Sequence, residues 1–220
     1  MTRLYLIRHC EAQGNLMRVF QGLSDFDISE TGARQLEFLG KRFADIHIDR
    51  LYSSTLKRAM KTAQAVADAK GMTVEPYSGI REINVGSLEG KNIEQVFKND
   101  PELFDVWKNH PQDFVPENGE PMQHTYERIW EAIQSLAREN EGKTIAAATH
   151  GGVTRCLLCR LLYGSIEHLY KSPWCDNTAI SLIEFDDNFN PNLVFYNDVS
   201  HLPPELLPTA SRIQSIMDKE

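Results

Sequence analysis

Two histidines, each placed directly after an apolar stretch, are the residues of this sequence best suited to chemistry. The apolar residues 4–7 lead to Arg8 and His9, and the apolar residues 145–148 lead to His150. Short apolar runs of this kind predict buried strands, and ligand crevices form at the carboxyl ends of strands in open α/β sheets. A histidine in such a crevice can act as a nucleophile, a general base or a metal ligand.

Taken alone, Arg8 and His9 fit an ion pair at a strand end better than they fit a catalytic site. Two further segments change this interpretation. Residues Ser53–Ala59 predict a strand end, serine N-caps and a helix whose first turn carries Arg58, which can aim a guanidinium group at an anion. Glu82 lies between apolar residues just before a glycine-rich turn, a setting that suits a proton-donating carboxylic acid.

Two histidines, two arginines and a carboxylate at strand ends are the groups that phosphoryl transfer without a metal requires. Guanidinium groups stabilise the charge on the transferred phosphoryl oxygens. An imidazole attacks phosphorus, and a carboxylic acid protonates the leaving oxygen. These side chains therefore predict a site for phosphoryl transfer.

Strands alternating with helices are needed to bring these groups together. Helical spacing of apolar residues predicts helices over 33–43, capped by Ser29 or Thr31, and over 56–69. Further strands are expected at 50–53, 73–76, 179–185 and 193–196, the last two as a hairpin, and further helices at 120–140 and from Val153 onward. The pattern predicts one α/β domain over residues 1–220, a three-layer sandwich with a mostly parallel sheet covered by helices on both faces.

Residues 92–123 interrupt this alternation. Prolines separate aromatic residues there, including Phe97, Phe104, Trp107 and Phe114. The pattern predicts an excursion of short helices, which can be a lid over the site, an insertion with its own small core, or both. The polar last dozen residues are expected to form a mobile tail.

The composition excludes several classes of protein. With 220 residues, of which 41% are hydrophobic and 25% charged, the chain is typical of a soluble globular domain. A net charge of −8 argues against a nucleic-acid partner, whose footprint would be basic. No apolar run resembles a signal peptide or approaches the length of a membrane span, so we expect a cytoplasmic protein without a membrane partner.

The cysteines fit a reducing compartment. Cys156 and Cys159 form a C-x-x-C in an apolar helical segment without a second such pair, so we expect buried structural thiols and no zinc site. Cys10, beside His9, is either an oxidisable thiol of low pKa or a simple spacer.

Four short segments carry the candidate groups: Arg8-His9-x-Glu11 with Asn15 following, Ser53-x-x-x-x-Arg58-Ala59-x-x-Thr62-Ala63, Arg81-Glu82, and Thr149-His150-Gly151-Gly152. In this order, and over most of the chain, they resemble the signature blocks of the histidine phosphatase superfamily, which includes the cofactor-dependent phosphoglycerate mutases. The chain departs from the family pattern at Cys10, because a glycine usually follows the catalytic histidine.

The resemblance implies a role for each matching residue. His9 would be the nucleophile that becomes phosphohistidine. Glu82 would be the general acid and then the base that activates water. Arg8, Arg58 and His150 would bind the phosphoryl group.

Asn15 matches a family position that can donate to a phosphoryl oxygen, although an amide there can equally stabilise the loop. The resemblance implies no metal and no cofactor. His124 and His201 could be proposed as metal ligands beside His9 and His150. Nothing in the sequence places them near the site, so we expect surface or structural roles for both.

The superfamily contains mutases, phosphatases and inactive binding modules, so the pocket must decide among them. Mutases carry Arg-His-Tyr after the glutamate, where this chain has Ile83-Asn84-Val85. They also place paired arginines in the excursion, where this chain offers Lys108 between Asp100 and Pro121. A bisphosphorylated ligand would need those cations.

We therefore predict a metal-independent phosphomonoesterase of the phosphatase branch that acts on small phosphorylated metabolites. A phosphoglycerate mutase is the alternative. An inactive phosphate-binding module is less favoured because every catalytic group is present. The sequence does not identify the substrate, and it fits a monomer or a homodimer.

Further residues are predicted to line the substrate pocket: Gln21, Gly22, Phe104, Trp107 and Gly151. The aromatic residues of the excursion either form a hydrophobic floor for the leaving group or only pack the excursion against itself.

Overall fold

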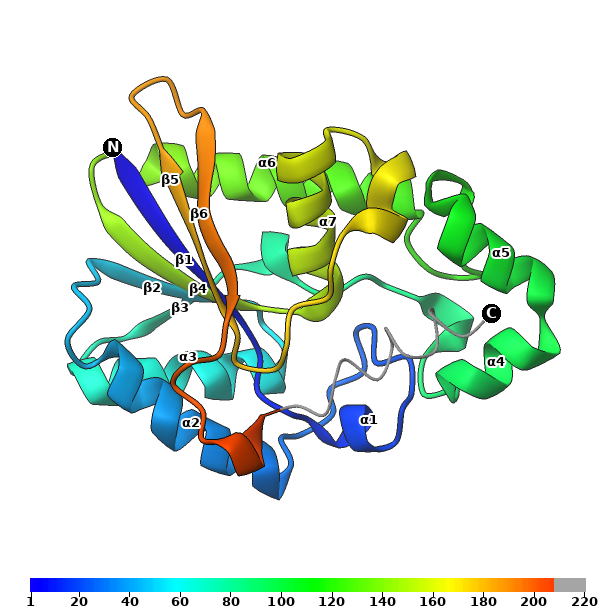
Figure 1. Cartoon of the computed structure of the whole chain (residues 1–220), viewed down its shortest axis with the longest axis horizontal. Coiled ribbons are helices and arrows are strands. Elements are labelled where there is room, and N and C mark those ends of the chain that lie inside the picture. Colours follow the sequence, from blue (N-terminus) through cyan, green and yellow to red (C-terminus); the bar gives the residue numbers. More distant parts are fainter. Residues whose placement is uncertain (208–220) are drawn as a thin grey trace.

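A computed structural model, shown in Figure 1, describes residues 1–207. In this part of the chain, strands form a 6-stranded sheet in the order β3-β2-β4-β1-β5-β6. The strands are β1 (Thr2–Arg8), β2 (Arg50–Ser53), β3 (Val74–Pro76), β4 (Thr144–Thr149), β5 (Ile180–Phe185) and β6 (Pro191–Asp198). The first four are parallel, and β5 and β6 form an antiparallel hairpin beside β1. The mostly parallel sheet is confirmed, whereas the expected tail lies outside the described residues.

Helices cover both faces of the sheet, as predicted (Figure 1). The helices α2 (Glu30–Phe43) and α3 (Lys57–Lys70) pack on one face, and α6 (Met122–Glu139) and α7 (Gly151–Tyr163) pack on the other. Side chains alternate along β1, so Leu4 and Leu6 belong to the core under α6 and α7, while Ile7 belongs to the core under α2 and α3. Burial on both faces explains why this strand is apolar throughout.

Short elements complete the described chain: α1 (Gln13–Leu16), α4 (Ile93–Asn99), α5 (Pro101–Asn109), and the 3-10 turns η1 (Ser78–Ile80), η2 (Gly86–Leu88), η3 (Pro111–Asp113), η4 (Ile166–Lys171) and η5 (Pro204–Leu206). Within residues 1–207, no helix combines the length and the apolar character needed to cross a membrane.

The residues that start α2 and α3 differ in kind. Ser29 caps α2, because its hydroxyl oxygen accepts a hydrogen bond from the Gly32 amide at 2.9 Å. The N-cap of α3 is Leu56, which makes no side-chain cap. The expectation that Ser53 or Ser54 caps α3 is therefore wrong, and Ser54 has another partner in the site described below.

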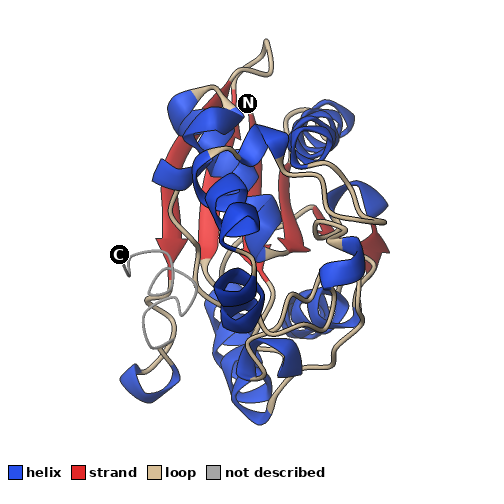
Figure 2. Cartoon of the chain, turned by 90° about the vertical axis from the view of Figure 1, so that its right-hand side faces the viewer, coloured by secondary structure: helices blue, strands red, loops and turns tan. Residues whose placement is uncertain are grey.

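The excursion consists of short helices, α4 and α5 with η3, and in the view of Figure 2 these helices lie in front of the strands. Trp107 packs against Phe20, Phe97 and Phe114, with ring centroids 5.6, 6.0 and 4.8 Å away. These aromatic residues belong to the same buried cluster as Leu6 of β1. The excursion therefore shares the main core, and the alternative of a separate small core is wrong.

Candidate active site

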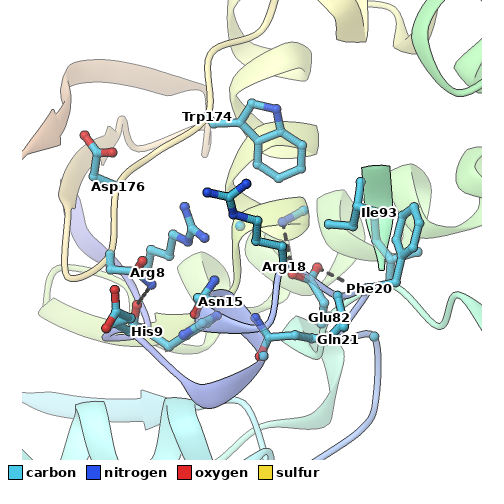
Figure 3. A pocket seen from close by; sticks show the side chains of 18 of the residues that line it. Arg8, His9, Asn15, Arg18, Phe20, Gln21, Glu82, Ile93, Trp174 and Asp176 are labelled. Atoms are coloured by element: carbon cyan, nitrogen blue, oxygen red, sulfur yellow. Dashed lines mark hydrogen bonds between the residues drawn. The ribbon is translucent and has the colours of Figure 1, made fainter. Parts of the chain in front are cut away.

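His9 directly follows β1, at the carboxyl edge of the sheet (Figure 3). Its Nδ1 lies 2.7 Å from the carbonyl oxygen of Cys10. Because a carbonyl oxygen only accepts hydrogen bonds, Nδ1 carries the proton and Nε2 keeps its lone pair. The side-chain amide of Asn177 donates to the His9 carbonyl at 2.9 Å. The ring and the backbone of His9 are thus fixed, and its nucleophilic nitrogen is free.

The second histidine lies beside the first because β1 and β4 are adjacent parallel strands. The ring centroids of His9 and His150 are 5.3 Å apart. Burial, followed by the charges of Arg58 and Arg8, lowers the pKa of His9 well below its ordinary value. Burial, and then Arg58, lowers the pKa of His150 in the same way. Both imidazoles are therefore neutral near pH 7, as a nucleophile requires.

Main-chain carbonyls hold the two buried guanidinium groups. Arg58 donates to the carbonyl oxygens of Ser24 and Gly22 at 2.8 and 2.9 Å, and Arg8 donates to that of Cys175. Both arginine side chains are buried, at 8% and 0% exposed for Arg8 and Arg58. Carbonyl oxygens fix a guanidinium group without neutralising its charge, so both groups remain available to an anion.

Three buried side-chain nitrogens of the site have no hydrogen-bond partner in residues 1–207: Nε of Arg8, Nε of Arg58 and Nδ1 of His150. The other ring nitrogen of His150 lies 2.7 Å from the Ser54 hydroxyl oxygen. A buried polar atom left unpaired costs about 1–3 kcal/mol, so such atoms are rare and need an explanation. Arg8 lines the cavity described below, whereas Arg58 and His150 lie behind its wall, so an anion with several acceptor oxygens that reached all three would satisfy them.

Glu82 supplies the carboxylate of the site. Its oxygens accept hydrogen bonds from the amides of Ile83 and Gly152 at 3.0 and 3.1 Å. A Cβ atom at Gly152 would lie 2.5 Å from Oε1 of Glu82, and one at Gly151 would lie 3.2 Å from the Arg8 guanidinium. The two glycines after His150 therefore make room for the charged side chains of the site.

The amide of Asn15 stabilises the loop and leaves its predicted contact with a phosphoryl oxygen open. Its Oδ1 accepts a hydrogen bond from the Ala12 amide at 2.9 Å, which stabilises the loop. The side chain also lines the cavity beside His9 (Figure 3). Because the loop uses only the oxygen, the amide nitrogen remains a donor for a ligand.

A cavity of about 330 Å³ opens at this site, within the range of small-molecule pockets. Of the predicted pocket residues, Gln21, Gly22, Trp107 and Gly151 line it. Phe104 does not, and its prediction needs correction. The ring of Phe104 packs on Phe97 at 5.0 Å, and the Lys108 ammonium lies 5.7 Å from its centroid.

Sequence reasoning missed part of the cavity wall. Arg18, Trp174, Asp176 and the η5 residue Leu206 all line the cavity. Trp174 and Asp176 come from the loop that enters β5, and they line the same cavity as His9 because β5 lies next to β1. These two residues could have been predicted to line the cavity if the sequence had shown that β5 lies beside β1. Apolar periodicity, however, does not give strand order.

Cys10 is a buried thiol, and burial raises its pKa to about 12. The hypothesis of a low-pKa thiol is therefore wrong. Its φ lies outside the left-handed region, so the backbone after His9 does not require glycine. A Cβ at Gly32 would collide with the Glu11 carbonyl oxygen and would also lie 3.3 Å from Sγ of Cys10, so glycine at position 32 lets α2 approach the backbone that follows His9.

The remaining sulfur and imidazole groups lie away from the cavity. Cys156 and Cys159 are buried free thiols, as expected. His124 lies 3.3 Å from Glu120, and His201 contacts Thr178. Among residues 1–207, no group of three His, Cys, Asp or Glu side chains could hold a metal ion.

A neutral imidazole with a free Nε2, set among uncompensated guanidinium groups, suits attack on an anionic phosphorus centre. Fold and site thus define an α/β enzyme that acts on phosphate esters. A family model described as histidine phosphatase superfamily (branch 1) matches residues 4–199, and the chain belongs to this superfamily.

Individual relatives agree with this assignment. The chain is 32% identical over 190 residues to phosphoserine phosphatase 1 of Hydrogenobacter thermophilus, covering 86% of this chain and 90% of the relative. The structure of Bacillus stearothermophilus YhfR is similar with a TM-score of 0.85 at 32% identity, covering 91% of this chain and 99% of that one.

A phosphoserine phosphatase mutant from Entamoeba histolytica, in complex with phosphoserine, is similar with a TM-score of 0.82 at 27% identity, covering 92% of this chain and 100% of that one. The predicted phosphatase is therefore confirmed as a phosphomonoesterase, and the mutase alternative has less support.

Proposed function

We propose that the protein hydrolyses small phosphomonoesters in two steps through a phosphohistidine at Nε2 of His9. In the first step, Nε2 forms a bond to phosphorus while the ester P–O bond breaks. The leaving oxygen takes a proton from Glu82. Arg8, Arg58 and His150 bind the phosphoryl oxygens, and the three unpaired buried nitrogens of these side chains are the observation that carries this proposal.

In the second step, water attacks the phosphohistidine. Glu82, now a carboxylate, takes a proton from the water molecule as its oxygen bonds to phosphorus. The P–N bond breaks, inorganic phosphate leaves, and Nε2 regains its lone pair. The hydrogen bond from Nδ1 of His9 to the Cys10 carbonyl keeps the ring in one tautomer throughout.

The cavity wall favours hydrolysis over mutase activity. The excursion contributes Ile93, Phe97 and Trp107 to the lining, all of them apolar. Its lysines, Lys98 and Lys108, both lie outside the lining, and the Lys108 ammonium lies over the ring of Phe104. On the excursion side of the cavity, the second phosphate of a bisphosphorylated ligand would meet apolar side chains, where an unpaired dianion is strongly disfavoured.

Phosphoserine belongs among the candidate substrates, because relatives with 32% and 27% identity carry the name phosphoserine phosphatase and one of them binds phosphoserine. We keep two further expectations as predictions: the chain acts in the cytoplasm, and it is a monomer or a homodimer.

Phosphate release from a panel of phosphomonoesters, measured with EDTA present, tests the proposal. We expect the wild-type protein to be active and the His9→Ala variant to lose at least about a thousandfold in kcat, since the nucleophile is removed. The exposed His124→Ala is the matched control and should retain full activity. Acid-labile label on His9 after rapid quenching with a phosphorus-labelled ester should accompany turnover.

Near-normal turnover by His9→Ala would contradict the proposal. Activity that is lost with EDTA and restored by a divalent metal would favour a metal-dependent hydrolase.

A further inference from the structure

Arg18 is a cation of the cavity that the proposed chemistry does not use. It lines the cavity and is exposed. In Figure 3 its side chain reaches into the cavity between Arg8 and Glu82, below Trp174. Within residues 1–207, its guanidinium group makes neither a hydrogen bond nor an ion pair with the protein.

The backbone holds Arg18 in an unusual conformation. Its φ is 54°, in the left-handed region that glycine and asparagine adopt more readily than arginine. The Arg18 amide donates to the Asn15 carbonyl at 3.2 Å, and the Arg18 carbonyl accepts from the Ile93 amide at 3.0 Å. Residue 18 is thus fixed between the loop after β1 and the start of α4, at the rim of the cavity.

The phosphoryl group already has its cations. Arg8 and Arg58 are buried and anchored by carbonyls, whereas Arg18 extends from the rim. A rim cation without a partner in the described part of the chain attracts an anionic group of the ligand other than the phosphoryl group.

Negative side chains limit what that anionic group can be. Glu11, Asp176 and Glu205 also line the cavity, and hydrogen bonds with Asn197 hold Asp176 in place. These negative charges repel a second phosphate dianion more strongly than they repel a singly charged carboxylate. One guanidinium group also matches the two oxygens of one carboxylate.

We propose that Arg18 binds the carboxylate of the substrate's leaving group and thereby selects phosphomonoesters that carry one. This inference rests on the proposed function and adds to it the residue that determines specificity. Arg18 does not touch the reacting phosphorus, so its effect falls on substrate binding and not on the chemical step.

Two matched substrate pairs test the inference. Phosphoserine and phosphoethanolamine differ in the carboxylate, as do 3-phosphoglycerate and glycerol 3-phosphate. Arg18→Asn removes the cation and suits the left-handed backbone, so the variant should fold. The control Lys98→Asn makes the same change in net charge on the exposed face of α4, outside the cavity lining.

We expect Arg18→Asn to raise KM about threefold to fivefold for the two carboxylates, the upper end of the range for one exposed charged contact. KM for the two carboxylate-free esters should change less than about twofold, and kcat should change little for all four. Arg18→Lys should restore part of the loss, and Lys98→Asn should change nothing.

An equal rise in KM for all four esters, or no rise for the carboxylates, would overturn the inference and leave the proposed hydrolysis intact. A wild-type protein that prefers the carboxylate-free esters would overturn it as well. Failure of the wild-type protein to hydrolyse any of the four would instead overturn the proposed function, and the inference with it.

Discussion

At the scale of single residues, the site works because its ionisable groups are buried unequally. His9 and His150 are buried beside arginines, which keeps both imidazoles uncharged. Glu82 is half-buried and lines the open cavity. The nucleophile is thus kept free of protons, while Glu82 faces the cavity, where the leaving oxygen and then the attacking water can exchange a proton with it.

Substitution of Glu82 should separate its role from that of His9. Glu82→Gln removes the proton that the leaving oxygen needs, so alkyl esters such as phosphoserine should lose about 10²–10⁴-fold in kcat. p-Nitrophenyl phosphate, whose leaving group is stable as an anion, should lose much less. Rates for a series of aryl and alkyl phosphates measure the difference, with the exposed Glu94→Gln as control. An equal loss for good and poor leaving groups would exclude Glu82 as the acid.

The residues that the sequence identified share one property: they follow strand ends or begin helices within recognisable blocks. His9 and His150 could be expected to share one crevice because both follow apolar runs that predict buried strands, but that these two strands are neighbours is known only from the structure. The positions of Arg18 and Asp176 at the cavity could not be predicted, because both residues lie in loops without periodicity. Their place depends on tertiary contacts with Ile93 and Asn197.

At the scale of elements, the loop of residues 21–24 connects Arg58 to the rest of the site. Glu89 accepts from the Leu23 amide at 2.8 Å and from the Ser24 hydroxyl at 2.5 Å. The carbonyls of Gly22 and Ser24 in turn hold Arg58. Gly22 has a φ of 49°, and a Cβ there would lie 2.4 Å from Oε1 of Glu89. Glu89 therefore acts as a positioning residue for Arg58.

Loss of Glu89 should weaken phosphate binding without affecting the proton transfer. We expect Glu89→Ala to raise KM and the inhibition constant of inorganic phosphate about threefold to thirtyfold, the effect of a loosened charge-assisted contact. Glu89→Gln should raise these two constants less than Glu89→Ala does, and the exposed Glu131→Ala should change neither constant. The dependence of kcat on the leaving group should not change. A change in this dependence would mean that Glu89 influences Glu82 and not Arg58.

Only some features of the excursion could be predicted from the sequence. Its existence and its short helices followed from its prolines and aromatic residues. The sequence did not predict which aromatic side chain faces the cavity, because the rotation of α5 about its axis depends on its packing partners. Trp107 meets Phe20 and the cavity, whereas Phe104, three residues earlier, meets Phe97 and Lys108.

At the scale of the whole molecule, one core links the excursion to the sheet. Phe97 and Phe114 belong to the same buried cluster as Leu6 and Ile145. We therefore propose that residues 1–220 form one domain that unfolds in one cooperative transition. The sequence predicted the layers of this domain and the hairpin, but strand order and the shared core required the structure.

The stability of this domain should fall as the pH is lowered. Burial lowers the pKa of His201 to about 4, and the pKa values of His9 and His150 are lowered as well. An unfolded histidine titrates near pH 6.5. Below that pH the unfolded chain binds more protons than the folded chain, so stability is lost as pH falls from about 7 towards 4.

Urea unfolding at pH 7 and pH 5 measures this loss. His201 does not line the cavity, so His201→Gln should reduce the pH dependence without a change in activity. Each histidine that stays neutral in the fold changes the folding constant by up to about tenfold per pH unit in this window. Equal stability at both pH values, or two separate transitions, would contradict the respective expectations.

The central position of β1 has a consequence for motion. β1 is paired on both sides, with β4 and β5, and strands of this kind open only when the whole molecule unfolds. The rim that carries Arg18 and Leu206 is built from a loop and a short turn, which open locally at far lower free energy. Amide hydrogen exchange would thus divide the cavity into a slow wall around His9 and a fast rim. We therefore expect the chemistry to be attached to the strand that opens last, and the choice of substrate to a rim whose few backbone hydrogen bonds open first.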